Sequence, residues 1–435
     1  MTRAPGSAVE SPSFDLHAFV RHLFPIARSL TGDGVRETLR AVAALSPLEI
    51  VEVASGTPVL DWEVPDEWNI RGATIRSLTG ETLVDFADSN LHVMGYSQAV
   101  RGIFSREVLA AHVHTLPEQP EAIPYRTGYY ARDWGFCIAH NVWSAMTDEV
   151  YKVEIDATLA PGALTYGEAF LPGSSDAEIL ISVHVCHPSL ANDNLTGIAL
   201  ATALANRAAR RPGRRLGLRF LFLPATIGAI TWLARNEDRV GRIRHGLVLT
   251  CLGDAAPFHY KQSRSGAPID RAVAHVLRHA GHPFAILPFS PYGYDERQYA
   301  SPAFDLPVGC LMRGVHGTFP EYHTSLDNLD FVRPDSLDAS FGVLCATLDL
   351  LDADRIYRRV DGRGEPQLGR RGLYRAIAGQ KEAGGASQLD LLWFLNLADG
   401  RHSLLDIAER ADIPFDRIAA AAALARDAHL VQEAP

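Results

Sequence analysis

The segment from Ile179 to Ala205 constrains the fold of this chain more than any other part of the sequence. Its first part is a continuous apolar run, which is typical of a strand buried on both faces and includes Ile179, Leu180, Ile181, Val183 and Val185. Its last part is rich in Ala and Leu and predicts a helix. A buried strand that leads through a short loop into a helix indicates an open, mainly parallel α/β sheet with helices on its faces.

The loop between this strand and helix carries imidazole and carboxylate side chains. His184 and His187 come first, and Asn192, Asp193 and Asn194 follow just before the helix. In an open parallel sheet, ligands bind in the crevice beyond the carboxyl ends of the strands. Either histidine alone is more often part of an ordinary polar loop, but the group together favours a metal site.

A second stretch, from Phe319 to Val332, carries the same kinds of side chain. Glu321 and His323 stand two residues apart, and Asp327 follows four residues later. A hydrolytic zinc site needs three N or O ligands from the protein and one open position. The loop and this distant stretch together could supply such a set.

Several motifs in this order resemble known zinc peptidases. The strand, the Asn-Asp-Asn-x-Thr-Gly loop and the later Tyr-His-Thr segment are similar to the M28-type zinc aminopeptidases. The resemblance to the bacterial DUF4910 family is closer and spans nearly the whole chain, through CHPSLANDNLTG (186–197), LTCLGD (249–254), DERQYASPAFDLPVG (295–309) and FPEYHTS (319–325). It implies a peptidase-like core with an inserted small β-rich domain and a C-terminal winged-helix segment.

The resemblance also implies a ligand set, with one departure. M28-type enzymes carry a Glu-Glu pair after the next strand, where this chain has Ala225 and Thr226. A second metal would need Cys251 or Asp254, so we expect a single zinc ion. Its predicted ligands are His187, Asp193 and His323, and His184 is the alternative to His187 because a direct alignment to M28 enzymes selects it.

Other residues near these motifs are candidates for catalysis and substrate binding. Glu321 would share a face with His323 in an extended segment and is the first candidate for the proton-transfer group, with Glu296 as the second. Asp295 and Arg297 would bind charged groups of the substrate, although the triplet Asp-Glu-Arg could equally be a surface turn. Tyr322 would donate to a developing oxyanion, and Asn194 is a further substrate-binding candidate.

These candidates predict a zinc-dependent, aminopeptidase-like hydrolase. It would use one metal ion to cleave the amide bond next to the free amino terminus of a peptide or aminoacyl metabolite. One alternative is a catalytically degenerate peptidase scaffold that binds a metabolite or partner, which Ala225 favours. Another is an acyl-transfer or cyclisation enzyme that uses a single zinc ion.

The predicted domain organisation follows from the pattern of strands, helices and turns. We expect a zinc-binding core in residues 14–60 and 116–360, an inserted β-rich domain in residues 61–115, a Gly- and Pro-rich linker in residues 361–375, and a winged-helix-like domain in residues 376–435. Trp62 and Trp68 are expected to pack inside the inserted domain.

Composition limits the partners and the compartment. The chain has 435 residues and a net charge of −10, which argues against nucleic-acid binding. Its five cysteines are widely spaced and indicate reduced thiols, and we find neither a secretion signal nor an apolar run long enough for a membrane helix. We therefore expect a cytoplasmic protein with a small peptide or aminoacyl substrate, no nucleic-acid or membrane partner, and a sequence compatible with a homo-oligomer.

Overall fold

The computed structural model describes residues 11–373 and 386–434. The chain divides into two compact units. The larger unit contains Pro12–Ala267 and Ala285–Phe341, and the smaller one contains Pro268–Phe284 and the described part of Gly342–Pro435.

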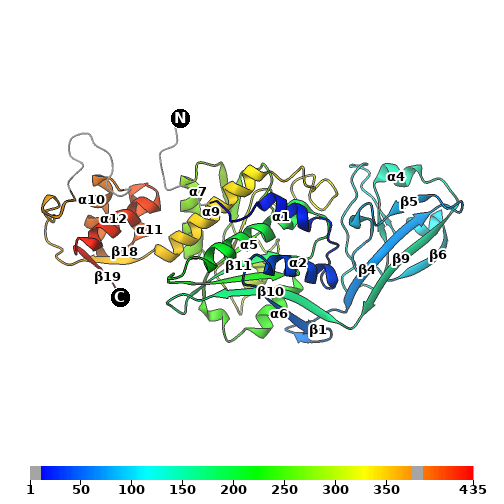
Figure 1. Ribbon diagram of the computed structural model, residues 1–435, viewed down its shortest axis with the longest axis horizontal. Coiled ribbons are helices and arrows are strands. Elements are labelled where there is room, and N and C mark those ends of the chain that lie inside the picture. Colours follow the sequence, from blue (N-terminus) through cyan, green and yellow to red (C-terminus); the bar gives the residue numbers. More distant parts are fainter. Residues whose placement is uncertain (1–10, 374–385, 435) are drawn as a thin grey trace. The chain divides into compact units, whose positions relative to one another are not determined.

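An eight-stranded mixed sheet forms the centre of the larger unit (Figure 1). Its spatial order is β1-β10-β12-β11-β13-β16-β14-β15. Strands β12, β11, β13 and β16 are parallel to one another, whereas β1, β10 and β14 run antiparallel to their partners. The strands comprise β1 Glu49–Ala54, β10 Ala163–Leu171, β11 Glu178–His184, β12 Gly217–Leu223, β13 Ile243–Leu249, β14 Phe258–Lys261, β15 Phe284–Leu287 and β16 Val308–Met312.

Strand β11 is central because every one of its residues is buried. Ile179 and Val183 pair with Leu218 and Phe222 of β12, and Ile181 pairs with Leu247 of β13. The apolar run thus forms the doubly buried strand that its composition predicts. The predicted fold class, a mainly parallel α/β sheet flanked by helices, is confirmed.

Helices cover both faces of this sheet. Figure 1 shows α1 and α5 on one side of it and α6 on the other. Helix α5 packs on β11 and α1, which brings its N-terminus next to the loop after β11. Asp15 caps α1 by accepting a hydrogen bond from the amide of Ala18 at 2.9 Å. The helices of this unit are α1 Leu16–Leu23, α2 Asp33–Ala43, α5 Thr196–Ala209, α6 Ile227–Arg235 and α8 Glu296–Tyr299.

A second, antiparallel sheet of the larger unit has the order β5-β4-β9-β6. Trp68 is buried there, and its indole N–H donates to the carbonyl of Ser97 at 2.8 Å. Trp62 is instead 51% exposed on a short hairpin, so its predicted packing role is wrong. The elements of this region are β2 Pro58–Val59, β3 Trp62–Glu63, β4 Glu67–Arg76, β5 Thr82–Asp85, β6 Val100–Ser105, α3 Arg106–Ala110, β7 Val113–His114, β8 Phe136–Cys137, α4 His140–Ala145 and β9 Val150–Ala160.

The predicted range of the inserted domain, 61–115, omits a strand of this sheet. Strand β9 lies between β4 and β6 and pairs with both, from Glu67 opposite Ala160 to Phe104 opposite Tyr151. The alternation of polar and apolar residues in β9 predicts a strand. It does not predict that this strand pairs with β4 and β6, which lie far away in the sequence. The range 116–160, which is predicted as part of the core, therefore contributes strand β9 to the small sheet.

The smaller unit combines helices with a three-stranded antiparallel sheet of order β18-β17-β19. Ser387 and Ser403 form capping boxes with Asp390 and Asp406 at the starts of α10 and α11. The elements are α7 Pro268–His279, the C-terminal part of α9 Pro334–Ala353, β17 Ile356–Arg359, α10 Gln388–Leu397, β18 Asp399–Ser403, α11 Leu404–Ala411, α12 Phe415–Asp427 and β19 Val431–Glu433.

The predicted winged-helix range, 376–435, omits β17, although β17 forms the middle of this sheet. The end of the predicted linker, 374–375, and the start of the predicted domain, 376–385, lie outside the described residues, as does Pro435. Within residues 11–373 and 386–434, we find no helix long and apolar enough to cross a membrane.

Candidate metal centre

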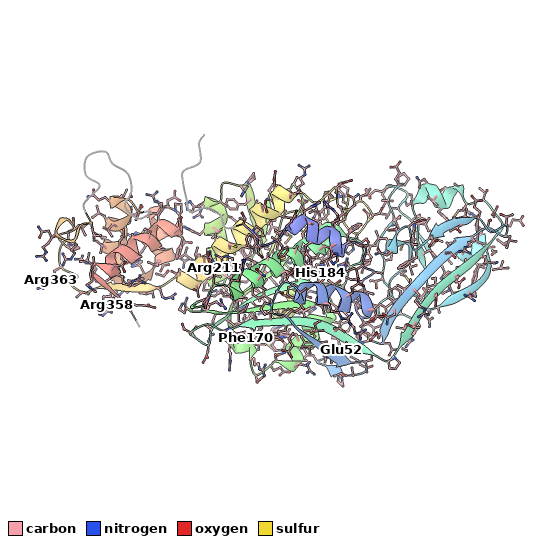
Figure 2. All side chains as sticks on the ribbon, in the orientation of Figure 1. Glu52, Phe170, His184, Arg211, Arg358 and Arg363 are labelled. Carbon is pink, nitrogen blue, oxygen red and sulfur yellow. The ribbon has the colours of Figure 1, made fainter. Side chains whose placement is uncertain are left out.

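The loop after β11 is a buried platform at the carboxyl end of the central strands. His184 is the last residue of β11 and is 1% exposed; Figure 2 shows it inside the larger unit, surrounded by side chains. The buried guanidinium of Arg28 holds the loop, because its Nε donates to the carbonyl of His187 at 2.8 Å and its Nη2 donates to that of Pro188 at 3.2 Å. The loop is therefore fixed by hydrogen bonds to its backbone.

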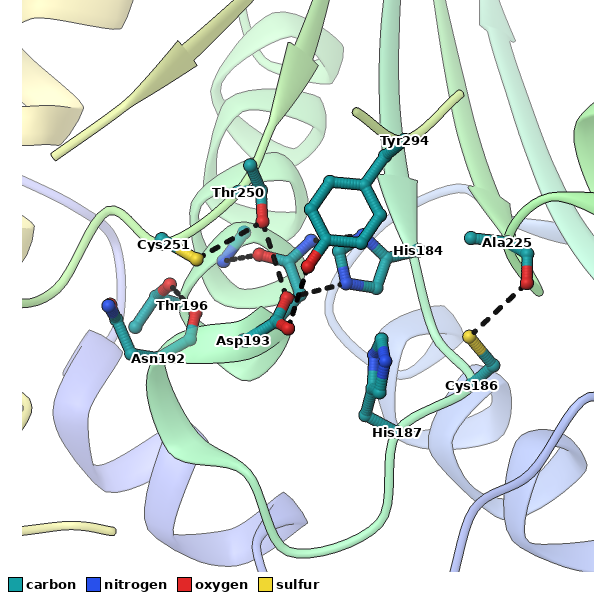
Figure 3. Close-up of polar contacts among 12 residues, drawn as sticks. His184, Cys186, His187, Asn192, Asp193, Thr196, Ala225, Thr250, Cys251 and Tyr294 are labelled. Carbon is teal, nitrogen blue, oxygen red and sulfur yellow. Dashed lines mark hydrogen bonds and ion pairs between the residues drawn. The ribbon is translucent and has the colours of Figure 1, made fainter. Parts of the chain in front are cut away.

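Asp193 is the hub of the site (Figure 3). Its Oδ1 lies 2.8 Å from His184 Nε2 and accepts a weaker hydrogen bond from the Thr250 hydroxyl at 3.4 Å. Its Oδ2 accepts a hydrogen bond from the Tyr294 hydroxyl at 2.8 Å and lies 3.1 Å from His323 Nε2. Each carboxylate oxygen thus faces one imidazole, and the two imidazoles come from segments far apart in the sequence.

Asp193 itself is held in place by its backbone. The amides of Asn192 and Asp193 donate to the two oxygens of Asp327 at 2.6 and 2.9 Å. Asn192 also donates through its side chain to Asp254 at 2.7 Å. These bonds fix the turn that leads into α5, which begins at Thr196. Asp327, which the sequence places near His323, therefore positions the hub residue.

His187 completes the cluster and is the member without a partner. Its ring centroid lies 4.9 Å from that of His184 and 5.2 Å from that of His323. Its Nδ1 is buried and has no hydrogen-bond partner among the described residues. His184, His187 and Asp193 offer ligand atoms that all lie within 4.8 Å of one another. The structure therefore brings both alternative histidines into the site.

The donor set fits a divalent cation of the zinc type. Tetrahedral zinc with bonds of about 2.0–2.1 Å keeps its ligand atoms about 3.3 Å apart. The contacts of Asp193 with His184 and His323, at 2.8 and 3.1 Å, approach that separation. A buried imidazole nitrogen without a hydrogen bond is unfavourable, and a bound cation would satisfy His187.

The protonation states of His187 and Asp193 also suit the binding of a divalent cation. Burial lowers the pKa of His187 well below its usual value, so its ring is neutral and can act as a ligand. Burial by itself raises the pKa of Asp193, but electrostatic interactions with His187 and His184 and hydrogen bonds from His184 and His323 hold it well below the usual value. The site therefore presents a carboxylate and a neutral imidazole.

Tyrosine rings surround the cluster, and only Tyr322 among them is a residue that the sequence motifs predict. The Tyr294 ring stacks on His184 with centroids 4.4 Å apart, and the Tyr322 ring stacks on His323 at 3.9 Å. Their hydroxyls share a hydrogen bond of 2.5 Å. Tyr125 contacts His187 and His323 edge-on, with both centroid distances at 5.0 Å. Tyr294 directly precedes the Asp-Glu-Arg triplet, and that position was the available signal.

The backbone around His323 is held by a segment that follows the small sheet. The φ angle of His323 is 55°, in the left-handed region, which costs an ordinary residue roughly 1–2 kcal/mol. The amide of Tyr125 donates to the carbonyl of His323 at 2.8 Å, and the amide of Ser325 donates to that of Ile123 at 2.8 Å. This pairing fixes the unusual conformation that directs His323 towards Asp193.

Other predicted site residues have different surroundings. Glu296 is buried in an ion pair with Lys261 and accepts a hydrogen bond from the amide of Tyr294 at 3.1 Å. Arg297 is exposed, and Glu321 is partly buried with no side-chain hydrogen bond to the cluster among the described residues. Asn194 donates to the carbonyl of Leu249 at 2.9 Å and accepts from the amide of Gly197. Its amide group therefore braces the start of α5.

Ala225 lies beside the cluster without a carboxylate. Its carbonyl accepts a hydrogen bond from the Cys186 thiol at 3.8 Å, as Figure 3 shows. Asp254, a candidate for a second metal, accepts hydrogen bonds from Asn192, Gly314 and Ala256. Burial raises the pKa of Cys251 well above its usual value, which keeps that thiol protonated.

The sheet and the cluster beyond its central strand define an aminopeptidase-like protein. The chain belongs to the family described as "Domain of unknown function (DUF4910)", which matches residues 17–354, as the motifs predict. Residues 355–433 match a winged helix-turn-helix family.

Solved and curated relatives agree with this placement. A Clostridium acetobutylicum protein named "Putative polysaccharide biosynthesis protein with aminopeptidase-like domain" is 44% identical over 409 residues, which cover 94% of each chain. A crystal structure of a "putative peptidase" from the same species superposes with a TM-score of 0.91 at 42% identity and covers 96% of each chain. The zinc aminopeptidase BSAP from Bacillus subtilis shares the fold, with a TM-score of 0.57 at 11% identity over 78% of this chain and 95% of that one.

Proposed function

We propose that this protein is a zinc-dependent hydrolase that cleaves the amide bond next to the free amino terminus of a peptide or aminoacyl compound. The proposal rests on the surroundings of Asp193. One of its carboxylate oxygens lies next to His184 and the other next to His323, and the nearby His187 has a buried nitrogen without a hydrogen bond among the described residues. Membership of an aminopeptidase-like family supports the reaction class.

One ion would be held by His187, Asp193 and His323, with His184 as the further ligand or the alternative to His187. A divalent ion there would act as a Lewis acid on the scissile carbonyl and on the attacking water. The ligand atoms of His184, His187 and Asp193 lie within 4.8 Å of one another and would suit a single zinc ion, and Asp254 is already used by three hydrogen bonds.

The residues of the chain would perform the remaining steps. Burial raises the pKa of Tyr294 well above its usual value and also raises that of Tyr322, so both hydroxyls stay protonated and can donate. Because Tyr294 donates to Asp193, the Tyr322 hydroxyl is the one that could turn to an oxyanion. Asp295 and Arg297 remain candidates for binding substrate charges, and Glu321 remains a candidate for proton transfer. The ion pair with Lys261 makes Glu296 a poorer one.

The test compares metal-free and zinc-restored protein on matched substrates. We expect the zinc-restored protein to hydrolyse aminoacyl p-nitroanilides, and the N-acetylated versions of the same compounds to react at least tenfold more slowly. Chelation should abolish the reaction and zinc should restore it. The masses of the products separate hydrolysis, which adds water, from cyclisation, which does not. A failure to release the chromophore from any free-amino substrate would favour a scaffold that binds without turnover.

A further inference from the structure

Asp295 is a buried carboxylic acid without a partner. It is 0% exposed, and neither carboxylate oxygen has a hydrogen-bond partner among the described residues. It occupies the N-cap position of α8, where an Asp side chain ordinarily accepts a backbone amide, yet it makes no such bond. Folding has thus buried a polar group and left its hydrogen-bonding capacity unused.

The neighbouring carboxylate shows that this arrangement is specific to Asp295. Glu296 is buried equally well, but Lys261 and the amide of Tyr294 satisfy it. The ammonium of Lys261 is further held by the carbonyl of Tyr292 at 2.8 Å. The ammonium of Lys261 therefore pairs with Glu296, and none of these contacts includes Asp295.

Asp295 lies beside the candidate metal centre. The residue before it, Tyr294, stacks on His184 and donates to Asp193. Asp295 itself interacts electrostatically with His184 and Cys186, and Cys186 in turn contacts the carbonyl of Ala225. Helix α8 packs against α6 and β16, so the position of this carboxylate is fixed by the fold.

We propose that Asp295 is the proton-transfer residue of the hydrolysis proposed above, on which this inference rests. Asp295 takes a proton from the attacking water while the water oxygen bonds to the carbonyl carbon. It then gives that proton to the leaving nitrogen as the C–N bond breaks, which returns Asp295 to its ionised form. The products are one carboxylic acid and one amine, with one water consumed.

The surroundings of Asp295 suit this role. Burial raises its pKa to about 7, above the ordinary value of a carboxyl group. A group that titrates near neutral pH can both accept and release a proton at working pH. A structural carboxylate gains from a fixed hydrogen-bond donor, whereas neither oxygen of Asp295 is committed to one among the described residues.

The test measures turnover, zinc content and thermal stability of Asp295→Asn. We expect kcat to fall roughly 10²–10⁴-fold with zinc content unchanged. Wild-type kcat/KM should rise with pH over the range in which Asp295 ionises, and this rise should disappear in the variant. The melting temperature should rise by roughly 2–4 °C or more at pH 8, since the amide removes a buried charge, and the gain should shrink towards pH 5.

The matched control is Asp305→Asn, which removes an exposed carboxylate paired with Arg264. It should leave the pH profile unchanged. If Asp295→Asn does not fold, Asp295→Glu decides the question. That variant keeps the charge but displaces it, so we expect kcat to fall about 10²-fold while the pH dependence remains.

Four outcomes overturn the inference. Turnover retained by Asp295→Asn overturns it alone and leaves the hydrolase proposal standing. Loss of zinc from this variant, or unchanged kcat in Asp295→Glu, would assign Asp295 another role. A wild-type protein that hydrolyses no free-amino substrate overturns both the inference and the proposed function.

Discussion

The two ends of strand β11 both bury charged side chains, and they treat them in opposite ways. At the N-terminal end, Glu178 and Arg219 are 2% and 5% exposed and form hydrogen bonds of 2.7 and 3.1 Å. Arg219 also pairs with Glu168, which accepts from the indole of Trp232 at 3.2 Å. At the C-terminal end, Asp193 gathers two imidazoles, while His187 retains an unpaired nitrogen.

The two ends differ in how far the protein itself pairs the buried polar groups. The network at Arg219 is closed, because its guanidinium is shared by two carboxylates and lies 4.5 Å from the ring centroid of Phe170. The cluster at Asp193 is open, because it offers more donors than the protein satisfies. Buried polar groups in native proteins are usually paired, which is why we propose the metal site at this end of the strand.

The largest effect should come from Asp193→Asn. We expect turnover to fall at least on the order of 10³-fold, since Lewis-acid catalysis contributes several kcal/mol and each 1.36 kcal/mol changes a rate tenfold. Bound zinc, measured by elemental analysis, should fall from about one equivalent to near zero, while circular dichroism remains native. Full zinc content in this variant would show that the hub residue is not a ligand.

Arg219→Leu should break the opposite end of the strand. It leaves the buried Glu178 and the partly buried Glu168 without their counter-charge, and breaking a buried ion pair typically destabilises a protein by about 3–5 kcal/mol. Urea unfolding measures the loss. We expect the zinc content of the folded variant to equal that of the wild type. A variant with wild-type stability that has lost its zinc would contradict the difference between the two ends.

A smaller change should follow from Tyr294→Phe. The variant removes the hydrogen bond of 2.8 Å to Asp193 and the one shared with the Tyr322 hydroxyl, and it keeps the ring that stacks on His184. Groups that orient a metal ligand are typically worth 10–100-fold in metal affinity. We expect a weakening of that size in competition with a fluorescent zinc chelator. The exposed Tyr292, changed to Phe, is the matched control and should leave the affinity unchanged.

The smallest effect concerns pH and the metal-free protein. Because burial lowers the pKa of His187, the unfolded chain binds a proton more readily than the folded one. The stability from this group is complete above about pH 6.5 and decreases as pH falls below that value, by at most about 1.4 kcal/mol per pH unit. Unfolding free energies between pH 7 and 5 should show the decline, and His187→Gln should flatten it.

The Arg219 network at the N-terminal end of β11 should contribute little to the pH dependence of stability between pH 7 and 5. Burial lowers the pKa of Arg219, but hydrogen bonds and charges of Glu178 and Glu168 raise it above its usual value, so it remains charged. A decline of equal steepness in His187→Gln would assign the pH dependence to other groups.

Sequence patterns identified the central strand and the residues that gather beyond it. The apolar run predicted β11. The imidazole and carboxylate side chains of the two motifs predicted that Asp193 and His323 would meet. Each prediction rests on the residue types of a short segment. The choice between His184 and His187 could not be made, since it depended on how the loop folds back. Both rings lie in the cluster, on a loop that Arg28 holds, and His184 remains the alternative to His187 as a ligand.

Other features depend on contacts that no local pattern records. The role of Tyr125 follows from its pairing with the backbone of His323, nearly two hundred residues away in the sequence. Asp295 and Glu296 differ because Lys261, at the end of strand β14, pairs with Glu296. Adjacent acidic residues look alike in a sequence, and only their tertiary surroundings separate them.

The most direct test of the account is anomalous X-ray diffraction from crystals of the zinc-loaded protein, measured at the zinc absorption edge. We predict one strong peak about 2.0–2.2 Å from ligand atoms of Asp193, His187 and at least one of His323 and His184. Crystals that bind zinc only elsewhere on the molecule, or that bind none, would contradict the metal centre and with it the proposed hydrolase.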